Sequence, residues 1–227
     1  MKNIFIYIIK FSIISKILLK PTLMLHGFFY KLSGVAATSV NKGRHPKHEI
    51  IKYSRWFNSN IGKNEVVLDI GCNTGTMTEE LAHQAKFVYG LEIEGKHIEE
   101  AIFLNKQANI KYICADATKF DYTNIDDIDI ITLSNVLEHI ENRVVFLKML
   151  TRRVPGVHTL LIRVPMIDRD WITIYKKNLG LDYRLDNTHF IEYTFEQFKS
   201  ELSECNISII SYHIRYGEIY AVCKAIN

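Results

Sequence analysis

Acidic residues follow three short apolar runs in the middle of the chain. Asp69 lies near the end of EVVLDI, Glu92 near the end of FVYGLEI, and Asp116 directly after IKYICA. An acid at the end of the second strand of a parallel sheet can accept hydrogen bonds from both hydroxyls of a ribose. Asp116, by its position after the third strand, suits the amino group of an adenine. Three acids at successive strand ends predict a nucleoside site.

A glycine-containing turn lies beside the first of these acids. Gly71 and Gly75 flank it in VLDIGCNTG (67–75), and a helical pattern begins after it. Glycine lets the backbone approach a ligand closely, and the free N–H groups at a helix start favour a carboxylate or a phosphate. The fingerprint of a dinucleotide site would need glycine at 73 and 76, where the chain has Asn73 and Thr76. An NAD-dependent oxidoreductase is therefore disfavoured.

Two histidines are the candidates for proton transfer. His139 follows the fourth apolar run in SNVLEHI (134–140), and Glu138 beside it is expected to orient it or to line the site. His189 lies in an insertion after the fifth run that is rich in polar, aromatic and cationic side chains. Such side chains suit a polar acceptor that carries a sugar, phosphate or carboxylate. The alternatives are a structural histidine and a well-capped surface loop. The insertion's candidates also include Asp168, Arg169, Trp171, Arg184, Asp186 and Tyr193.

Short apolar runs alternate with amphipathic stretches of helical length from residue 65 onward. This alternation is typical of βαβ units and a parallel sheet. A helix is predicted over TFEQFKSELSE (194–204), with Thr194 as its N-cap. NISIISYHIRYGEIYAVCKA (206–225) is expected to form two strands joined at Gly217, and such a hairpin must be antiparallel. We therefore expect an α/β fold whose ligands bind at the carboxyl ends of the parallel strands.

The order of these motifs resembles that of the class I S-adenosylmethionine-dependent methyltransferases. The resemblance rests on VLDIGCNTG, GLEIE, CADAT, DIITLSNVLEHI and the VPG turn before VHTLLIRV, and covers residues 45 to about 225. It implies a Rossmann-like, doubly wound, seven-stranded sheet with an antiparallel last strand. It also implies a cofactor site. The residues that surround the methionine part of the cofactor are then Asp69, Gly71, Cys72, Asn73 and Gly75. Glu92 binds the ribose, Ile93 packs on the adenine, and Asp116 with Ala117 meets the adenine edge; Asn135 is the remaining cofactor residue. Asn73 departs from the more usual glycine.

The resemblance implies transfer of a methyl group from S-adenosylmethionine, for which no metal site is predicted. We expect O-methylation of a small, glycan-like or lipid-linked acceptor. N- or C-methylation of a soluble metabolite remains open, as does a non-catalytic scaffold that binds the cofactor. In such proteins the region of residues 41–56 often forms a lid over the cofactor, and a solvated linker is the alternative for this stretch.

The amino-terminal residues 1–40 form a basic, apolar segment, which we separate from a methyltransferase domain over residues 41–227. At about 100° per residue, Lys2, Lys16 and Lys20 share one helical face, and Lys10 lies about 80° further round. Lysines interrupt the apolar runs too often for a membrane span or a signal peptide. An amphipathic helix on an anionic membrane surface through residues 1–34 is one expectation, and a helix that caps the chain's own core or a dimer partner is the other. Pro21 is expected to break or kink this helix.

The composition is that of a folded protein with an uneven charge. Of 227 residues, 48 % are hydrophobic and 23 % charged, which excludes a disordered chain. Residues 1–56 hold ten Lys or Arg and one acid, whereas the rest hold 18 and 24. An acidic body without an RNA-binding module argues against nucleic acid. The four separated cysteines predict reduced thiols and a cytoplasmic chain. The basic front and its lysine face add the expectation that the chain is peripheral at the inner membrane face.

Overall fold

The computed structural model describes residues 12–42, 45–156 and 159–226, and these divide into two compact units. The first contains the described residues up to Lys52 together with Asp170–Leu185, and the second contains Tyr53–Arg169 and the described residues from Asp186 onward. The predicted boundary at residue 40 falls at the end of the first long helix. Each unit is described by itself below.

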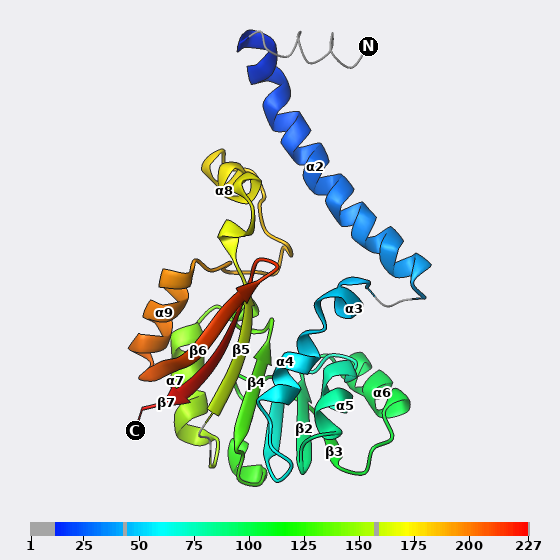
Figure 1. Ribbon diagram of the computed structural model, residues 1–227, viewed down its shortest axis with the longest axis vertical. Helices are drawn as coiled ribbons and strands as arrows, with labels where there is room; N and C mark the ends of the chain where they lie inside the picture. The colour runs from blue at the N-terminus through cyan, green and yellow to red at the C-terminus, as the bar shows by residue number, and fades with distance from the viewer. Residues whose placement is uncertain (1–11, 43–44, 157–158, 227) are drawn as a thin grey trace. The chain divides into compact units, whose positions relative to one another are not determined.

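The second unit is built on one seven-stranded sheet (Figure 1). The strands lie in the order β3-β2-β1-β4-β5-β7-β6, with β1 to β5 parallel and β7 antiparallel to both β5 and β6. This confirms the predicted sheet. The strands are β1 Val66–Ile70, β2 Phe87–Glu92, β3 Ile110–Cys114, β4 Ile130–Ser134, β5 Thr159–Pro165, β6 Ile207–Arg215 and β7 Glu218–Ala225.

Helices cover both faces of this sheet (Figure 1). They are α4 Tyr53–Ser59, α5 Thr76–Ala82, α6 Gly95–Leu104, α7 Arg143–Arg153 and α9 Phe195–Glu204. Because side chains alternate along a strand, Val67 of β1 packs with α4 and α5, whereas Leu68 packs in the core that α7 and α9 share. Burial on both faces explains why the parallel strands read as continuous apolar runs.

The local signals at the carboxyl-terminal end of the chain are confirmed. Thr194 caps α9 in a capping box, in which its hydroxyl accepts from the Gln197 N–H and the Gln197 side chain accepts from the Thr194 N–H. Tyr216 and Gly217 both have positive φ values, 52° and 71°, between β6 and β7. Two consecutive positive φ values are what a tight hairpin turn of type I′ requires.

The first unit contains α2 Ser12–Val40, α3 Lys47–Ile51 and α8 Trp171–Asn178. The predicted break at Pro21 is absent, because α2 stays helical through it. Pro21 removes one backbone donor, and the neighbouring Thr22 hydroxyl donates to the carbonyls of Leu18 and Leu19. No helix among the described residues combines the length and the apolar character of a membrane span. Lys2 and Lys10 of the predicted lysine face lie outside the described residues.

Candidate functional site

The turn after β1 contains three left-handed residues in five positions. Gly71, Asn73 and Gly75 have φ values of 72°, 50° and 77°. Asparagine adopts this conformation more readily than other side-chain-bearing residues, which explains how Asn73 can stand where a glycine is more usual. A Cβ on Gly75 would lie 2.3 Å from Oη of Tyr112, so the turn has room there for glycine alone. The sequence therefore fixes a tight turn before α5.

Glu92 holds this turn to the end of β2. Its carboxylate accepts hydrogen bonds from the backbone N–H of Asn73 (3.0 Å), Ile93 (2.9 Å) and Glu94 (3.0 Å). Ile93, the residue predicted to pack on the adenine, is 60 % exposed although it is apolar. The predicted ribose and adenine residues thus lie side by side at the end of β2, next to the turn after β1.

Asp116 stands beside them, because Glu92 pairs with Cys114 in the β2–β3 register. The Asp116 carboxylate accepts from the Thr118 N–H and hydroxyl, at 2.9 and 2.7 Å, and pairs with Lys119. The hydrogen bonds from Thr118 are the main reason why the pKa of Asp116 lies below its usual range. Ala117 is partly buried against the core. The structure therefore brings the ends of β1, β2 and β3 together, as the three acids predicted.

Asp69 and Cys72 support the turn from inside the protein. Asp69 is fully buried, and its two carboxylate oxygens accept from the hydroxyls of Thr78 and Thr132, each at 2.7 Å. Burial raises the pKa of Asp69 to about 6. Cys72 is also buried, and burial raises the pKa of its thiol. Both were predicted to surround the cofactor. Because Asp69 has no exposed surface, we assign it instead to positioning the turn.

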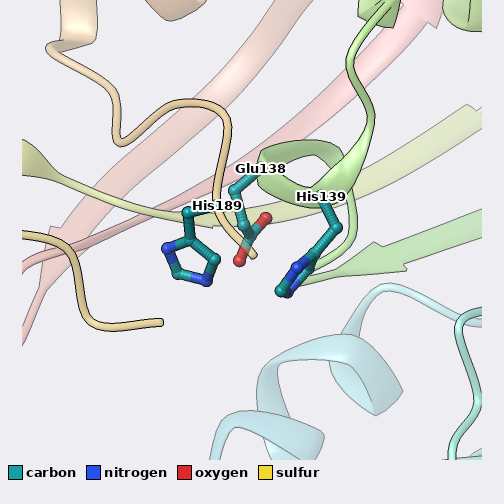
Figure 2. A group of neighbouring side chains, drawn as sticks. All are labelled: Glu138, His139 and His189. Atoms are coloured by element: carbon teal, nitrogen blue, oxygen red, sulfur yellow. The ribbon is translucent and has the colours of Figure 1, made fainter. Parts of the chain in front are cut away.

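A second group of polar side chains gathers after β4. Glu138 and His139 lie on the 3-10 turn Leu137–His139, and His189 comes from the insertion after β5. One ligand-type atom of each side chain lies within 4.8 Å of those of the other two. Figure 2 shows the carboxylate of Glu138 between the two imidazole rings, whose centroids are 4.7 Å apart. We call these three residues the Glu138 cluster. The structure thus brings together the two histidines that the sequence singled out.

Each ring of the cluster is held through its Nδ1 atom. His139 Nδ1 lies 2.8 Å from the Thr188 hydroxyl, which donates to Asp186 at 2.8 Å. Since the hydroxyl has one proton, it accepts from His139, so Nδ1 of His139 carries the hydrogen. Nδ1 of His189 lies 3.2 Å from the buried carboxylate of Glu192. Both rings are therefore oriented by groups outside the cluster.

Glu138 differs from the acids on the cofactor side because no partner occupies its carboxylate. It is 0 % exposed, and neither oxygen has a hydrogen-bond partner among the described residues. Burial raises the pKa of the Glu138 carboxyl to about 8. Burial and the nearby His189 keep the pKa of His139 below its usual value. A buried carboxyl that lacks a partner is costly, and such groups concentrate at functional sites.

A buried polar frame beneath the cluster is the part that the sequence analysis missed. Arg163 of β5 is 3.6 Å from Glu218 of β7, and its guanidinium lies 3.8 Å from the centre of the Tyr53 ring. Asn135, predicted as a cofactor residue, donates to Glu218 at 3.4 Å, and its Oδ1 has no partner among the described residues. Tyr220 also donates to Glu218. The sequence did hold a signal for this frame, because Arg163 interrupts the apolar run LLIRV (160–164).

The predicted insertion is divided between several roles. Arg169 pairs with Glu192, which holds His189, so it supports the cluster. Tyr193 is fully buried and donates to Glu201 at 2.6 Å, which makes it a core residue. Trp171 and Arg184 belong to the first unit. Within the second unit, Arg169 and His189 are residues of the insertion that the structure places at the cluster.

Comparison with known protein families identifies this site. Residues 68–155 match the model of a methyltransferase domain. This stretch of the chain matches a methyltransferase domain, and the chain has the fold of the class I S-adenosylmethionine-dependent methyltransferases. S-adenosylmethionine is accordingly its cofactor, and the residues at the ends of β1 to β3 fit it. The glycine turn admits close approach, Glu92 supplies a carboxylate at the ribose position, and Ile93 offers an exposed apolar side chain for the adenine.

Solved structures share the fold at low sequence identity. The small RNA methyltransferase HEN1 matches with a TM-score of 0.61 and 21 % identity, over 78 % of this chain and 25 % of that one. Magnesium protoporphyrin IX methyltransferase from Synechocystis PCC 6803, solved with bound SAH, matches with a TM-score of 0.59 and 16 % identity, over 79 % and 83 % of the two chains. These likenesses concern the fold of the methyltransferase domain.

Curated relatives match over shorter stretches. A probable cobalt-precorrin-6B C(15)-methyltransferase of Methanocaldococcus jannaschii is 40 % identical over 53 residues, 23 % of this chain and 27 % of its own length. A probable ribosomal RNA small subunit methyltransferase A of Methanosphaera stadtmanae is 34 % identical over 92 residues, 39 % and 32 % of the two chains. The chain thus spans about a third or less of these relatives. Since two of these four proteins are RNA methyltransferases, the expectation that nucleic acid is an unlikely partner has no support here.

Proposed function

We propose that the protein is an O-methyltransferase whose acceptor hydroxyl binds at the Glu138 cluster. The observation that carries this proposal is the position of the cluster. A Cβ on Gly71 would lie 2.7 Å from Val136, so the cofactor turn touches the segment that leads directly into Glu138 and His139. The cluster therefore lies at the next strand end along the sheet edge, beside the cofactor turn.

When bound, S-adenosylmethionine supplies a methyl group already activated by its sulfonium. The chain must then hold the acceptor oxygen in line with that methyl group and remove the hydroxyl proton. Positioning of this kind is worth roughly 7 to 11 kcal/mol, and a positioned base about 10²- to 10⁴-fold in rate. The S–C bond breaks with its electron pair on sulfur, the O–C bond forms, and the hydroxyl proton leaves through the cluster to solvent.

The first unit supports an acceptor at a membrane surface. The α2 helix exposes a series of large apolar side chains, contains Lys16, Lys20 and Lys31, and has no acidic residue. On α8, Trp171 is 70 % exposed. Apolar burial combined with lysines that reach anionic headgroups describes a helix lying in the membrane interface. We therefore propose a cytoplasmic enzyme, peripheral at the inner membrane face, that acts on a lipid-linked or glycan-like acceptor. The exposed residues of α2 include Ile13, Ile17, Met24, Leu25, Phe28, Phe29, Tyr30, Leu32 and Val35.

Labelled methyl transfer in a fractionated cell extract tests this proposal. The chain is incubated with methyl-labelled S-adenosylmethionine and extract separated into aqueous, lipid and RNA fractions. We expect label in the lipid or small-molecule fraction, on an oxygen atom located by mass analysis. Label in RNA would instead indicate an RNA acceptor, as the names of the similar RNA methyltransferases suggest. Cofactor binding without any labelled product would indicate a non-catalytic scaffold.

Flotation with anionic liposomes tests the membrane part separately. The full chain and a variant that lacks residues 1–34 are compared on vesicles with and without anionic lipid. We expect the full chain to float with anionic vesicles and the truncated chain to stay in the soluble fraction. Equal recovery of both chains in the soluble fraction would overturn the membrane proposal and leave the enzymatic one standing.

A further inference from the structure

We propose that Glu138, His139 and His189 bind a divalent metal ion, and that this ion binds the acceptor oxygen. Two imidazoles and one carboxylate are a recurrent ligand set for catalytic zinc and for other divalent transition metals. Zinc lies about 2.0 to 2.2 Å from such atoms, so two ligands of one tetrahedral ion stand about 3.3 to 3.6 Å apart. The ligand atoms already lie within 4.8 Å of one another. Binding therefore requires these atoms to close on one another by up to about 1.5 Å.

Hydrogen bonds outside the cluster orient both imidazole rings. Because Nδ1 of His139 donates to Thr188, its Nε2 carries the lone pair that a metal needs. Nδ1 of His189 faces the carboxylate of Glu192, which Arg169 in turn holds. A histidine ligand is commonly oriented in this way, with its second ring nitrogen donating to a carboxylate or another oxygen. Both rings therefore have the support that metal ligands have.

Glu138 supplies the independent observation that something binds here. Its two carboxylate oxygens are buried without a hydrogen-bond partner among the described residues, although burial of such a group is costly. A cation between Glu138 and the histidines would satisfy it. Asp69, buried to the same degree, is satisfied by two threonine hydroxyls. The structure thus provides internal partners where the acid is structural and none where we place the metal.

The ligand set indicates which ion binds and what it does. Two nitrogen ligands favour Zn²⁺, Fe²⁺, Ni²⁺ or Cu²⁺ over Mg²⁺, Ca²⁺ and Mn²⁺, which prefer oxygen. Three protein ligands leave coordination positions for oxygens of the acceptor. A metal-bound hydroxyl loses its proton more easily, and that proton passes to solvent before the oxygen accepts the methyl group. This deepens the proposed function, on which it rests, by assigning His139 to the metal rather than to direct proton transfer. The acceptor class is then a molecule whose hydroxyl oxygen can bind the metal ion.

Calorimetric titration of the full chain with Zn²⁺ tests the site without cofactor or acceptor. After dialysis against a chelator, we expect the wild-type chain to bind one equivalent. His189→Ala and Glu138→Gln should each weaken binding by at least about 100-fold, and Thr188→Val, which removes an orienting partner, by about 10-fold. The control is His83→Ala, an exposed histidine outside the cluster, which should change affinity less than about twofold. Circular dichroism confirms that each variant folds.

A separate titration with S-adenosylmethionine distinguishes this inference from the proposed function. We expect every folded variant to keep its cofactor affinity. No Zn²⁺ binding by the wild-type chain, or equal binding by His189→Ala, would overturn the metal site, even with cofactor binding intact. Metal binding without methyl transfer to any extract fraction would instead overturn the proposed function.

Discussion

The carboxylates at the ends of β1 to β3 and the carboxylate of Glu138 after β4 have opposite surroundings. On the cofactor side, Glu92 accepts three backbone hydrogen bonds and Asp116 is held by Thr118. After β4, where we propose that the acceptor binds (the acceptor side), Glu138 is buried with no such partner among the described residues and faces two histidines. The carboxylates of the first region already have hydrogen-bond partners from nearby residues, so this region is ordered before the cofactor binds. The second region needs a ligand to complete it, which is what a site for chemistry requires.

The largest effect is expected on the acceptor side, from His139→Ala. Turnover should fall by about 10²- to 10⁴-fold, because the variant loses a ligand of the proposed metal ion, which promotes loss of the acceptor's proton. Cofactor affinity should stay within about twofold, because His139 lies outside the set at the ends of β1 to β3. Labelled methyl transfer with the true acceptor and calorimetry with the cofactor measure the two quantities. Full turnover in the variant would remove His139 from the reaction.

The cofactor turn is tested by Gly75→Ala, with Gly180→Ala as its matched control. Both glycines have positive φ, 77° and 68°, so alanine costs about 1 to 2 kcal/mol at either position. A Cβ at Gly75 would also meet Tyr112 and Asn105, whereas nothing lies within 4 Å at Gly180. We expect Gly75→Ala to lower the free energy of unfolding by about 3 kcal/mol or more in urea titration. Equal losses would show that the turn tolerates a side chain.

The substitution Asp69→Asn tests how the buried carboxyl of Asp69 changes the stability of the chain with pH. Burial raises the pKa of Asp69 in the folded chain to about 6, above 3.8 for the exposed group. Between these pH values the folded chain holds a proton that the unfolded chain has lost. The free energy of unfolding therefore falls by about 3 kcal/mol as the pH rises from 4 to 6. Above pH 6 this proton causes no further loss of stability. The stability of wild type relative to Asp69→Asn should fall by that amount between pH 4 and pH 7. A constant difference in urea unfolding would contradict this.

Glu92→Ala should give the smallest effect. Loss of a charged hydrogen-bond acceptor should weaken S-adenosylmethionine binding by about 1.5 to 3 kcal/mol. Glu138→Gln is the matched change on the acceptor side and should leave cofactor affinity nearly unchanged. Calorimetry on both variants separates the two regions. If Glu92→Ala bound the cofactor as wild type does, the ribose assignment would be wrong.

The sequence was sufficient for the fold and for the meeting of the ends of β1 to β3, because both depend on short-range patterns. Apolar runs, a glycine turn and an acid at each strand end are all visible within a few residues. The acceptor side depends on contacts between distant segments. His189 meets His139 across 50 residues, and Arg163 meets Glu218 across two strands that are neighbours only in the folded sheet. Sequence patterns could nominate these residues singly, but they could not show that Glu138 lacks a partner.

A crystal structure of the full chain with S-adenosylhomocysteine and Zn²⁺ would examine both regions in one measurement. We predict the ribose against Glu92, the adenine between Ile93 and Asp116, and the sulfur on the side of the turn that faces the Glu138 cluster, which holds the metal. A nucleoside bound away from the ends of β1 to β3 would contradict the cofactor assignment. A metal absent from the Glu138 cluster would contradict the acceptor assignment.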